Sequence, residues 1–399
     1  MPFAPPRAPT TTSLTSFTPE RSFVDRHART VSQTQHPPTL HPIEVMRRTR
    51  PDQSNSPAPA STTGPGATNP YDQRAIAASR PRPVAAICFA ALTLILSVTP
   101  ARAQPAAPRD NPILIRMDSG VQEIAGRPAF DYDAYLVAAD SNRVILQQLL
   151  AEDQVRTPGD FFHASSAVSD LGGYYENRRI EHEMALMALI LGHPDAAKRF
   201  ALTWDALHFS LGRGQRLGRY TRDGVPYKMA LNPAPSLVRE WFADTMAVHP
   251  TARGPANAEL ERIRAADQAD RVEPIDATKV QSMRRNDPLR LARVKELLDQ
   301  GVPSTGRDFH NAAVVLQHAD EADDYALAHE LAVVAVALGD TSAVWLISRT
   351  YDRMLLKLGH RQRFGTQYLG SRLQPMDTTA VNDRIRVTLG SRRLAEIVR

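Results

Sequence analysis

Two segments of this chain resemble each other, and no other feature of the sequence limits its fold as strongly. Residues 155–220 align with residues 302–367 without a gap, and nineteen of the 66 paired positions are identical. The identical pairs include Gly159/Gly306, Phe162/Phe309, His163/His310, His182/His329, Glu183/Glu330, Gly192/Gly339, Asp205/Asp352, Gln215/Gln362 and Arg216/Arg363. A repeat of this length is a small helical bundle and not one turn of a solenoid. We therefore expect two related units in tandem.

Apolar residues at helical spacing and cap residues predict an all-α fold for both units. The expected helices span residues 140–153 and 287–300, 177–191 and 324–338, 196–211 and 342–358, and 235–248 and 379–389, and one further pair begins near Asp160 and Arg307. Asp287 at the N-cap and Pro288 at the first helical position begin one of them. Asp223-Gly224, between residues of strand type, predicts a small β-hairpin in the first unit. We expect the first, degenerate unit at 140–250, a linker at 251–280 and the second unit at 281–399.

The N-terminal quarter of the chain has a different composition. Residues 1–83 hold 15 of the 31 prolines and show no sustained apolar period, which predicts a disordered leader or a translation start placed too far upstream. Residues 84–103 have the layout of a secretory signal peptide, with cleavage after Ala103. Their apolar run is 15 residues long, whereas a membrane span needs about 20. The sequence thus predicts an exported protein, periplasmic or secreted, with a single N-terminal membrane anchor as the alternative.

Charge and cysteine usage narrow the classes of partner. The first 103 residues carry 11 of the 48 Lys and Arg and 5 of the 43 Asp and Glu, so the rest of the chain carries 37 and 38. This near neutrality disfavours nucleic acid as a partner. Membrane contact is expected only through the signal segment, if that segment is not cleaved. The single cysteine, Cys88, lies in that segment, so the mature chain is expected to have no disulfide, thiolate metal site or cysteine nucleophile.

The second unit contains a set of polar residues near predicted helix ends. They are His310, His318, His329, Glu330, Asp352, Arg353, Gln362, Thr366 and Gln367. One interpretation is a pocket that holds a small ligand or a metal ion, since His, Asp and Glu are suitable metal ligands. The other is that these groups satisfy helix ends and one another, as buried polar groups must. No histidine stands at 333, which excludes the zinc-protease helix, so we assign no metal site, and the sequence leaves the cofactor unknown.

The first unit lacks several of these groups. Leu171 stands in place of His318, Ala206 in place of Arg353, and Arg219 and Tyr220 in place of Thr366 and Gln367. A pocket, if the chain has one, is therefore expected in the second unit.

The motifs of residues 283–396 also resemble a known group of proteins. They are Asn286-Asp287 with Arg290, Asp308-Phe-His-x-Ala-Ala313, Leu316-Gln-His318, Leu327-Ala-His329, Asp352-Arg353, Gln362-Arg-Phe-Gly-Thr-Gln367 and Pro375 to Gly390. This region is similar to an uncharacterised bacterial family marked by Asp-Arg followed by Gln-x-aromatic-Gly-Thr-Gln. The resemblance implies an all-helical domain, makes the loop from Gln362 to Gln367 its most specific feature, and implies no particular activity.

Three functional hypotheses follow from these observations. The first is an exported helical binding or interaction protein, of unknown small-molecule or protein ligand, with a polar pocket in the second unit. The second is an enzyme, a hydrolase or a metal-dependent one, that uses His310, His329 and Asp352 as acid, base and orienting group. The third is a structural scaffold without a concave polar pocket.

Overall fold

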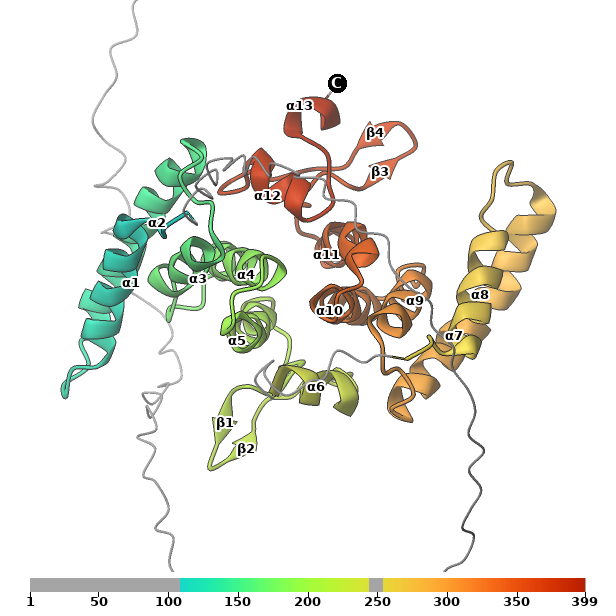
Figure 1. The fold of residues 1–399 in the computed structure, drawn as a ribbon, viewed down its shortest axis with the longest axis horizontal. Coiled ribbons are helices and arrows are strands. Elements are labelled where there is room, and N and C mark those ends of the chain that lie inside the picture. Colours follow the sequence, from blue (N-terminus) through green and yellow to red (C-terminus); the bar gives the residue numbers. More distant parts are fainter. Residues whose placement is uncertain (1–107, 244–253, 399) are drawn as a thin grey trace, which may run out of the picture. The chain divides into compact units, whose positions relative to one another are not determined.

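The computed structural model describes residues 108–243 and 254–398. These residues form helices together with two small antiparallel hairpins (Figure 1). The expected all-α class is confirmed. The leader and the signal segment predicted at 1–83 and 84–103 lie outside the described residues.

We call residues 111–243 the first half and residues 257–398 the second half. The first half contains α1 (Pro112–Ala125), α2 (Tyr132–Ala151), α3 (Pro158–Ala167), α4 (Tyr175–Ile190), α5 (Ala196–Ser210), β1 (Thr221–Arg222), β2 (Val225–Pro226) and α6 (Ser236–Ala243). The second half contains α7 (Ala258–Ala269), α8 (Ala277–Asp299), α9 (Gly306–Leu316), α10 (Ala322–Ala337), a 3₁₀ turn (Thr341–Ala343), α11 (Val344–Lys357), β3 (Tyr368–Leu369), β4 (Arg372–Leu373), α12 (Asp383–Thr388) and α13 (Leu394–Ile397).

Matching capping boxes begin the third helix of each half. The Thr157 hydroxyl accepts the N–H of Asp160 at 2.9 Å, and the Asp160 carboxylate accepts the N–H of Thr157 at 3.0 Å. Thr305 and Asp308 make the same two contacts at 3.2 and 3.0 Å. Each box satisfies two N–H groups that a helix start otherwise leaves unpaired. The local sequence therefore fixes where α3 and α9 begin.

Glycine ends the fourth helix in each half. Gly192 and Gly339 have φ values of 88° and 93°, a left-handed conformation in which a side chain is strained. The residues that follow, His193 and Asp340, donate their N–H groups back to the carbonyls of Ala188 and Ala335 at 2.9 Å. This is the Schellman pattern, in which a glycine in the left-handed conformation ends the helix.

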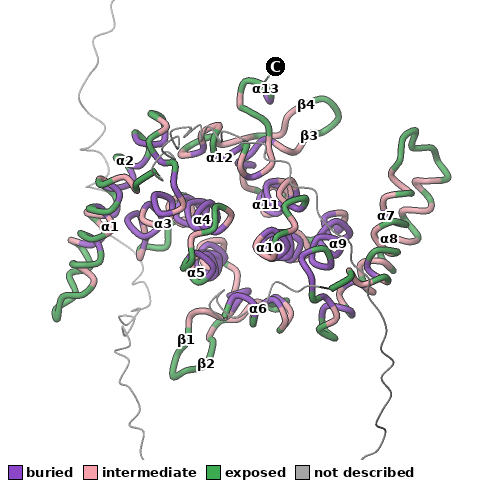
Figure 2. Tube along the Cα trace, in the orientation of Figure 1, coloured by how far each residue is buried: buried purple, intermediate pink, exposed green. Residues whose placement is uncertain are grey.

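Helices α4 and α10 lie at the centre of the core (Figure 2). Every residue from Arg179 to Leu189 and from Ala326 to Val336 is buried. Helix α4 packs between α3 and α5, α10 packs between α9 and α11, and α4 also packs against α10. A helix that is buried on all sides needs such neighbours on every face. The two halves therefore share one core.

Two expected helix starts are wrong. Helix α2 begins at Tyr132 with Asp131 as its N-cap, and not at Asp140. Helix α8 begins at Ala277 with Asp276 as its N-cap, so Pro288 lies inside the helix. A proline in a helix removes one hydrogen bond, and α8 continues through Pro288 in spite of this loss.

Asp287 does not cap a helix. Its carboxylate instead binds Arg271 at 2.6 Å and Arg290 at 3.0 Å. The pair with Arg271 joins α8 to the end of α7, whereas the pair with Arg290 lies within α8. The segment expected to be a linker, 251–280, thus contains α7, which packs against α9, and the start of α8.

The C-terminal part of each half also differs from the expectation. The hairpin predicted at Asp223-Gly224 is present as β1 and β2. A second hairpin, β3 and β4, and the short helix α13 were not expected. The last predicted helix, 379–389, is reduced to α12, because Asn382 caps its start.

Candidate functional site

Asp352, on α11, fixes the loop that follows this helix. Its carboxylate accepts the backbone N–H groups of Arg363 at 2.6 Å, Phe364 at 3.0 Å and Thr366 at 3.1 Å, and the Thr366 hydroxyl at 2.8 Å. Burial raises the pKa of Asp352, and these hydrogen bonds oppose the rise. A carboxylate whose lone pairs are taken up by its own chain organises a loop and is not available to a substrate.

Gln362 and Gln367 hold the same loop against the hairpin β3–β4. The side chain of Gln362 accepts the N–H of Gln367 at 2.8 Å and donates to the carbonyls of Gln367 and Gln374, both at 2.9 Å. The Gln367 side chain accepts from Arg353 at 3.1 Å, and Arg353 also donates to the carbonyl of Gln317. Five of the predicted site residues, Asp352, Arg353, Gln362, Thr366 and Gln367, are therefore brought together, in a loop support and not in a cavity wall.

The first half builds a simpler version of this support. The Asp205 carboxylate accepts the backbone N–H groups of Arg216, Leu217 and Arg219, each at 2.8 Å. Gln215 accepts the N–H of Tyr220 at 2.6 Å, as Gln362 does for Gln367. Burial raises the pKa of Asp205 to about 6, against the lowering effect of the three N–H groups. The geometry shared by the two loops needs only the aspartate and the glutamine.

Glu330 is buried and reaches across to the first half. Its carboxylate accepts from Nε and Nη2 of Arg216 at 2.5 and 2.9 Å, and from the indole N–H of Trp204 at 2.7 Å. Glu183 makes the corresponding contact in the opposite direction, accepting from Nε and Nη2 of Arg363 at 2.6 and 2.8 Å. All four charged side chains are at most 1 % exposed. These two ion pairs join the halves, and the carboxylates of Glu183 and Glu330 are both bound in them.

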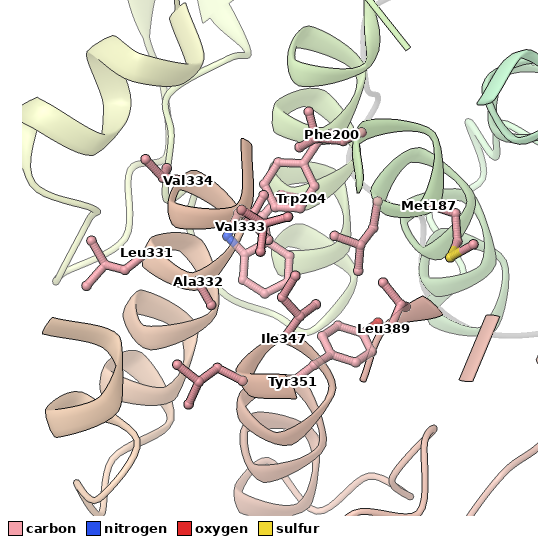
Figure 3. Packing of buried hydrophobic residues seen from close by; sticks show 14 of the residues in the cluster. Met187, Phe200, Trp204, Leu331, Ala332, Val333, Val334, Ile347, Tyr351 and Leu389 are labelled. Atoms are coloured by element: carbon pink, nitrogen blue, oxygen red, sulfur yellow. The ribbon is translucent and has the colours of Figure 1, made fainter. Parts of the chain in front are cut away.

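His329 is fully buried next to Glu330 and belongs to a cluster of rings. Its ring centroid lies 5.0 Å from that of Trp204, 5.4 Å from that of Tyr351 and 6.1 Å from that of His182. Figure 3 shows Trp204 and Tyr351 meeting in the shared core. The Nδ1 atom of His329 lies 3.1 Å from the carbonyl of Ile347. Burial lowers the pKa of His329 to about 4, so the ring is neutral at pH 7.

His310 and His318 stand apart from this cluster, at opposite ends of α9. His310 Nδ1 lies 3.1 Å from the Asp340 carboxylate and 3.0 Å from the Ser342 hydroxyl. His318 Nε2 lies 3.7 Å from the Asp267 carboxylate, and burial lowers the pKa of His318 to about 3. Neither histidine joins the loop support of Asp352.

The acid, base and orienting group proposed for an enzyme are thus held by three separate sets of partners. His310 contacts Asp340, His329 contacts a backbone carbonyl, and Asp352 contacts backbone amides. Proton transfer between such groups needs contacts of roughly 3 Å or one bridging water. The structure gives that arrangement no support.

None of the nine predicted residues lines either of two pockets on the described part of the chain. One pocket, of about 240 Å³, is lined by Leu217, Gly218, Arg219, Ser236, Arg239, Glu240 and Ala243. The other, of about 530 Å³, is lined by Leu150, Ala151, Asp153, Asn382, Asp383, Arg384, Val387, Thr388 and Arg393.

The gapless alignment of the two segments is wrong in α3 and α9. The capping boxes pair Asp160 with Asp308, an offset of 148, whereas the later equivalent residues differ by 147. His163 and His310 are therefore not equivalent, and His163 contacts Asp118 at 2.7 Å on α1. The shorter turn before α10 accounts for the difference, since α4 and α10 return to an offset of 147.

The sequence analysis missed the arginines that complete the site. Arg216 and Arg363 were among the identical pairs but not among the candidate residues, although both are buried and both bind a glutamate of the other half. Their identity in both segments was the signal that could have found them. The same identity marked Glu183 and Glu330.

Two general properties bear on function. Within residues 108–243 and 254–398, no group of three or more His, Cys, Asp or Glu side chains is arranged to hold a metal ion. In the same ranges, no helix combines the length and apolar character of a membrane span. A comparison with models of protein families, with curated proteins and with solved structures finds no match to this chain.

Proposed function

We propose that this chain is an exported helical interaction protein that acts by binding a protein partner and not by catalysis. The hydrogen bonds made by the buried charged and polar groups support this proposal. Glu183, Glu330, Asp205 and Asp352 are each saturated by arginine or backbone donors. Buried carboxylates that accept such hydrogen bonds stabilise a framework, whether or not every acceptor site is filled, and the exposed surface is left for partners.

One surface fits such a role, on the outer face of α2. Val137 and Val144 lie two helical turns apart and are 66 % and 70 % exposed. The opposite face of the same helix is buried through Leu146, Leu149 and Leu150. Asp140 and Ser141 are also exposed and lie between the two valines on this face, so the face offers two separate apolar contacts and polar groups between them to a protein partner. This aligned exposure is the observation that carries the proposal.

The test is a binding comparison between matched variants. The double substitution Val137→Asp and Val144→Asp charges the α2 face, while Leu289→Asp charges an apolar residue on α8 that is 67 % exposed. Immobilised wild-type protein and both variants are incubated with an extract of the source organism, and the captured proteins are identified after cross-linking. We expect the α2 variant to lose a partner that the α8 variant retains. Identical capture by all three proteins would remove the α2 face from consideration.

Export is the second part of the proposal, and it rests on the signal layout at 84–103. N-terminal sequencing of protein from a bacterial host should give Gln104 as the first residue. Protein that keeps residues upstream of Ala103 and sediments with membranes would instead support the anchored alternative.

A further inference from the structure

Three arginines lie close together on the second half. Arg349 and Arg353 are one turn apart on the outer side of α11, where their neighbours in sequence are buried and they are not, and Arg392 lies between α12 and α13 (Figure 1). Burial and the charge of Arg392 lower the pKa of Arg349, and burial together with the charges of Arg349 and Arg271 lowers the pKa of Arg353. Arginine stays charged in spite of such shifts. The second half thus holds like charges next to one another.

Uncharged groups orient two of these guanidinium groups. Cζ of Arg349 lies 4.9 Å from the centre of the Trp345 ring, and Nη1 of Arg349 donates to the Trp345 carbonyl at 3.2 Å. Cζ of Arg392 lies 5.9 Å from the centre of the Tyr368 ring, and Nη2 of Arg392 donates to the Tyr368 hydroxyl at 2.8 Å. These contacts fix the arginines in position but leave their charge without a counter-charge.

In the described part of the chain, no aspartate or glutamate forms an ion pair with Arg349, Arg353 or Arg392. Arg353 donates to the side-chain oxygen of Gln367 at 3.1 Å and to the carbonyl of Gln317. The planar fork of donors in arginine matches a carboxylate, which is bound more strongly than a neutral acceptor. The three arginines therefore present donors suited to an anion that the described residues do not supply.

The first half shows what completes an arginine cluster at the corresponding place. The carboxylate of Glu181 accepts from Nη1 of Arg178 and from Nη2 of Arg199, both at 2.8 Å. Burial raises the pKa of Tyr220, and the charges of Arg178, Glu181 and Arg199 all act on its hydroxyl. One carboxylate of the chain itself thus binds two arginines beside Tyr220.

Tyr220 and Gln367 occupy equivalent places in the two halves. The Tyr220 hydroxyl donates to the carbonyl of Leu202 at 3.4 Å, and the Gln367 amide donates to the carbonyl of Arg349 at 3.5 Å. Leu202 and Arg349 are related by the same offset of 147 residues. The arginines of the second half therefore lie where the first half has an apolar side chain.

The second half lacks the carboxylate that the first half uses. Ala328, which is fully buried, stands at the position of Glu181. The arginines near it, Arg349 and Arg353, have no counterpart of Glu181 among the residues that the structure describes. The carboxylate that would complete this cluster has to come from another molecule.

We propose that the α11 patch binds an acidic segment of a protein partner, whose carboxylates take the role that Glu181 has in the first half. The α11 patch consists of Trp345, Arg349, Arg353, Tyr368 and Arg392. The proposal goes beyond the proposed function and does not rest on it, because it concerns a surface of the second half and not the outer face of α2.

The charges around the α11 patch favour a short acidic segment over a long polyphosphate. Burial raises the pKa of Tyr325, and the charge of Arg353 acts on this hydroxyl together with three acidic residues, Asp320, Asp324 and Glu321. Acidic residues therefore lie close to the Arg353 end of the patch. They would repel a nucleic acid or an anionic membrane that continued past this end.

The size and composition of the α11 patch also fit a peptide. Trp345 and Arg353 are eight residues apart on one helix, so the patch extends for about 12 Å, the length of about four residues of extended chain. Arginine, tryptophan and tyrosine are the residue types that contribute most at protein interfaces.

The experiment uses a rhodamine-labelled peptide of about six glutamates as the probe, and fluorescence anisotropy as the measurement. We expect the wild-type chain to bind this peptide, to bind it more weakly as salt is raised, and not to bind the same peptide made of glutamines. No binding of the glutamate peptide at low salt, or equal binding of both peptides, would overturn the proposal.

The double variant R349E/R392E tests whether the α11 patch is the site. Reversal of both charges should weaken binding of the glutamate peptide by about tenfold or more. The matched control R116E/R222E changes the net charge equally, at two exposed arginines of the first half, and should weaken binding by about twofold at most. Equal losses in the two variants would refute the α11 patch. Thermal unfolding checks that each variant is folded. If R349E/R392E is not, Arg392→Glu at the exposed position decides by the same comparison with Arg222→Glu.

Two further arms separate this proposal from its neighbours. The α2 variant V137D/V144D should bind the glutamate peptide about as the wild type does, so failure of the α2 face and failure of the α11 patch give different results. A single-stranded oligonucleotide of similar charge should bind more weakly than the peptide. If it binds more tightly and R349E/R392E abolishes this binding, the patch recognises phosphate, and the acidic protein segment is refuted.

Discussion

The two halves contain the same arrangement of buried polar contacts, but equivalent carboxylates accept different numbers of hydrogen bonds. In the second half, Asp352 receives a hydroxyl from Thr366 in addition to three backbone amides, while Asp205 receives only the amides. In the contacts between the halves, the carboxylate of the second half again has the additional donor. Glu330 accepts from Trp204 as well as Arg216, whereas Arg363 supplies the hydrogen bonds made to Glu183 among the described residues. Equivalent residues of the two halves thus make the same contact, but their removal is expected to lower the free energy of unfolding by different amounts.

The largest expected effect comes from breaking the less supported ion pair. Arg363→Ala leaves Glu183 fully buried without its donor, which should lower the free energy of unfolding by about 3–5 kcal/mol. Arg216→Ala should cost about 1–2 kcal/mol less, because the indole N–H of Trp204 still binds Glu330 at 2.7 Å. Urea denaturation of both variants at pH 7 measures the difference. Equal losses would show that the indole contact contributes nothing.

A second prediction concerns acid. Burial lowers the pKa of His329 to about 4, from an ordinary value of 6.5. Because the unfolded chain then binds the proton more tightly, the free energy of unfolding should fall by about 3 kcal/mol for this residue as the pH falls from about 6.5 to 4. His329→Asn keeps a donor near the Ile347 carbonyl but does not titrate in this range, so it should flatten the pH dependence.

His182 provides the comparison for that measurement. Burial also lowers the pKa of His182, and its Nδ1 lies 3.2 Å from the Thr203 hydroxyl. His182→Asn should therefore flatten the same region of the curve, and the double variant more than either single one. Unfolding curves recorded at pH 4, 5, 6 and 7 test this. A pH dependence unchanged by both substitutions would mean that other groups dominate it.

The helices could be predicted from sequence because their signals are local. Thr157 with Asp160, and Gly192 after an apolar helix, act within a few residues of each other. The start of α8 was mispredicted because Asp287-Pro288 is also a good local start, and only the longer pattern from Asp276 shows otherwise. Where two local signals compete, tertiary packing determines which of them begins the helix, and this packing cannot be read from the sequence.

The site was only partly predictable, for a different reason. Identity between the segments marked Glu330 and Asp352 correctly as buried polar positions, but identity does not say which group each one binds. Arg216 reaches Glu330 over 114 residues of chain, a contact with no local signature. Of the nine residues in the predicted polar set, five support the loop after α11, His329 and Glu330 lie at the contact between the halves, and His310 and His318 belong to neither group.

A third prediction compares the glycines of the two loops, Gly365 and Gly218. Gly365 and Gly218 have φ values of 72° and 73°, so alanine is strained by about 1–2 kcal/mol at either place. A Cβ at Gly365 would also lie 2.8 Å from Ile397, while one at Gly218 would come no closer than 3.3 Å to Pro226. Gly365→Ala should thus lower the free energy of unfolding by about 1–2 kcal/mol more than Gly218→Ala. Thermal unfolding of both variants measures this, and equal losses would mean that Ile397 moves aside freely.

The smallest expected effect is at an exposed contact between the halves. Arg384 on α12 binds Asp153 after α2 with both N to O distances at 2.7 Å, and the two side chains are 38 % and 46 % exposed. Water and salt screen such a pair, so Arg384→Ala should cost less than about 1 kcal/mol at low salt and almost nothing at 1 M NaCl. The cost of Arg363→Ala should barely change with salt, because that pair is buried. Urea denaturation of both variants at the two salt concentrations separates the cases. Equal losses of unfolding free energy in the Arg384 and Arg363 variants, both insensitive to salt, would contradict this prediction. Burial would then not explain the difference between the buried and the exposed ion pair.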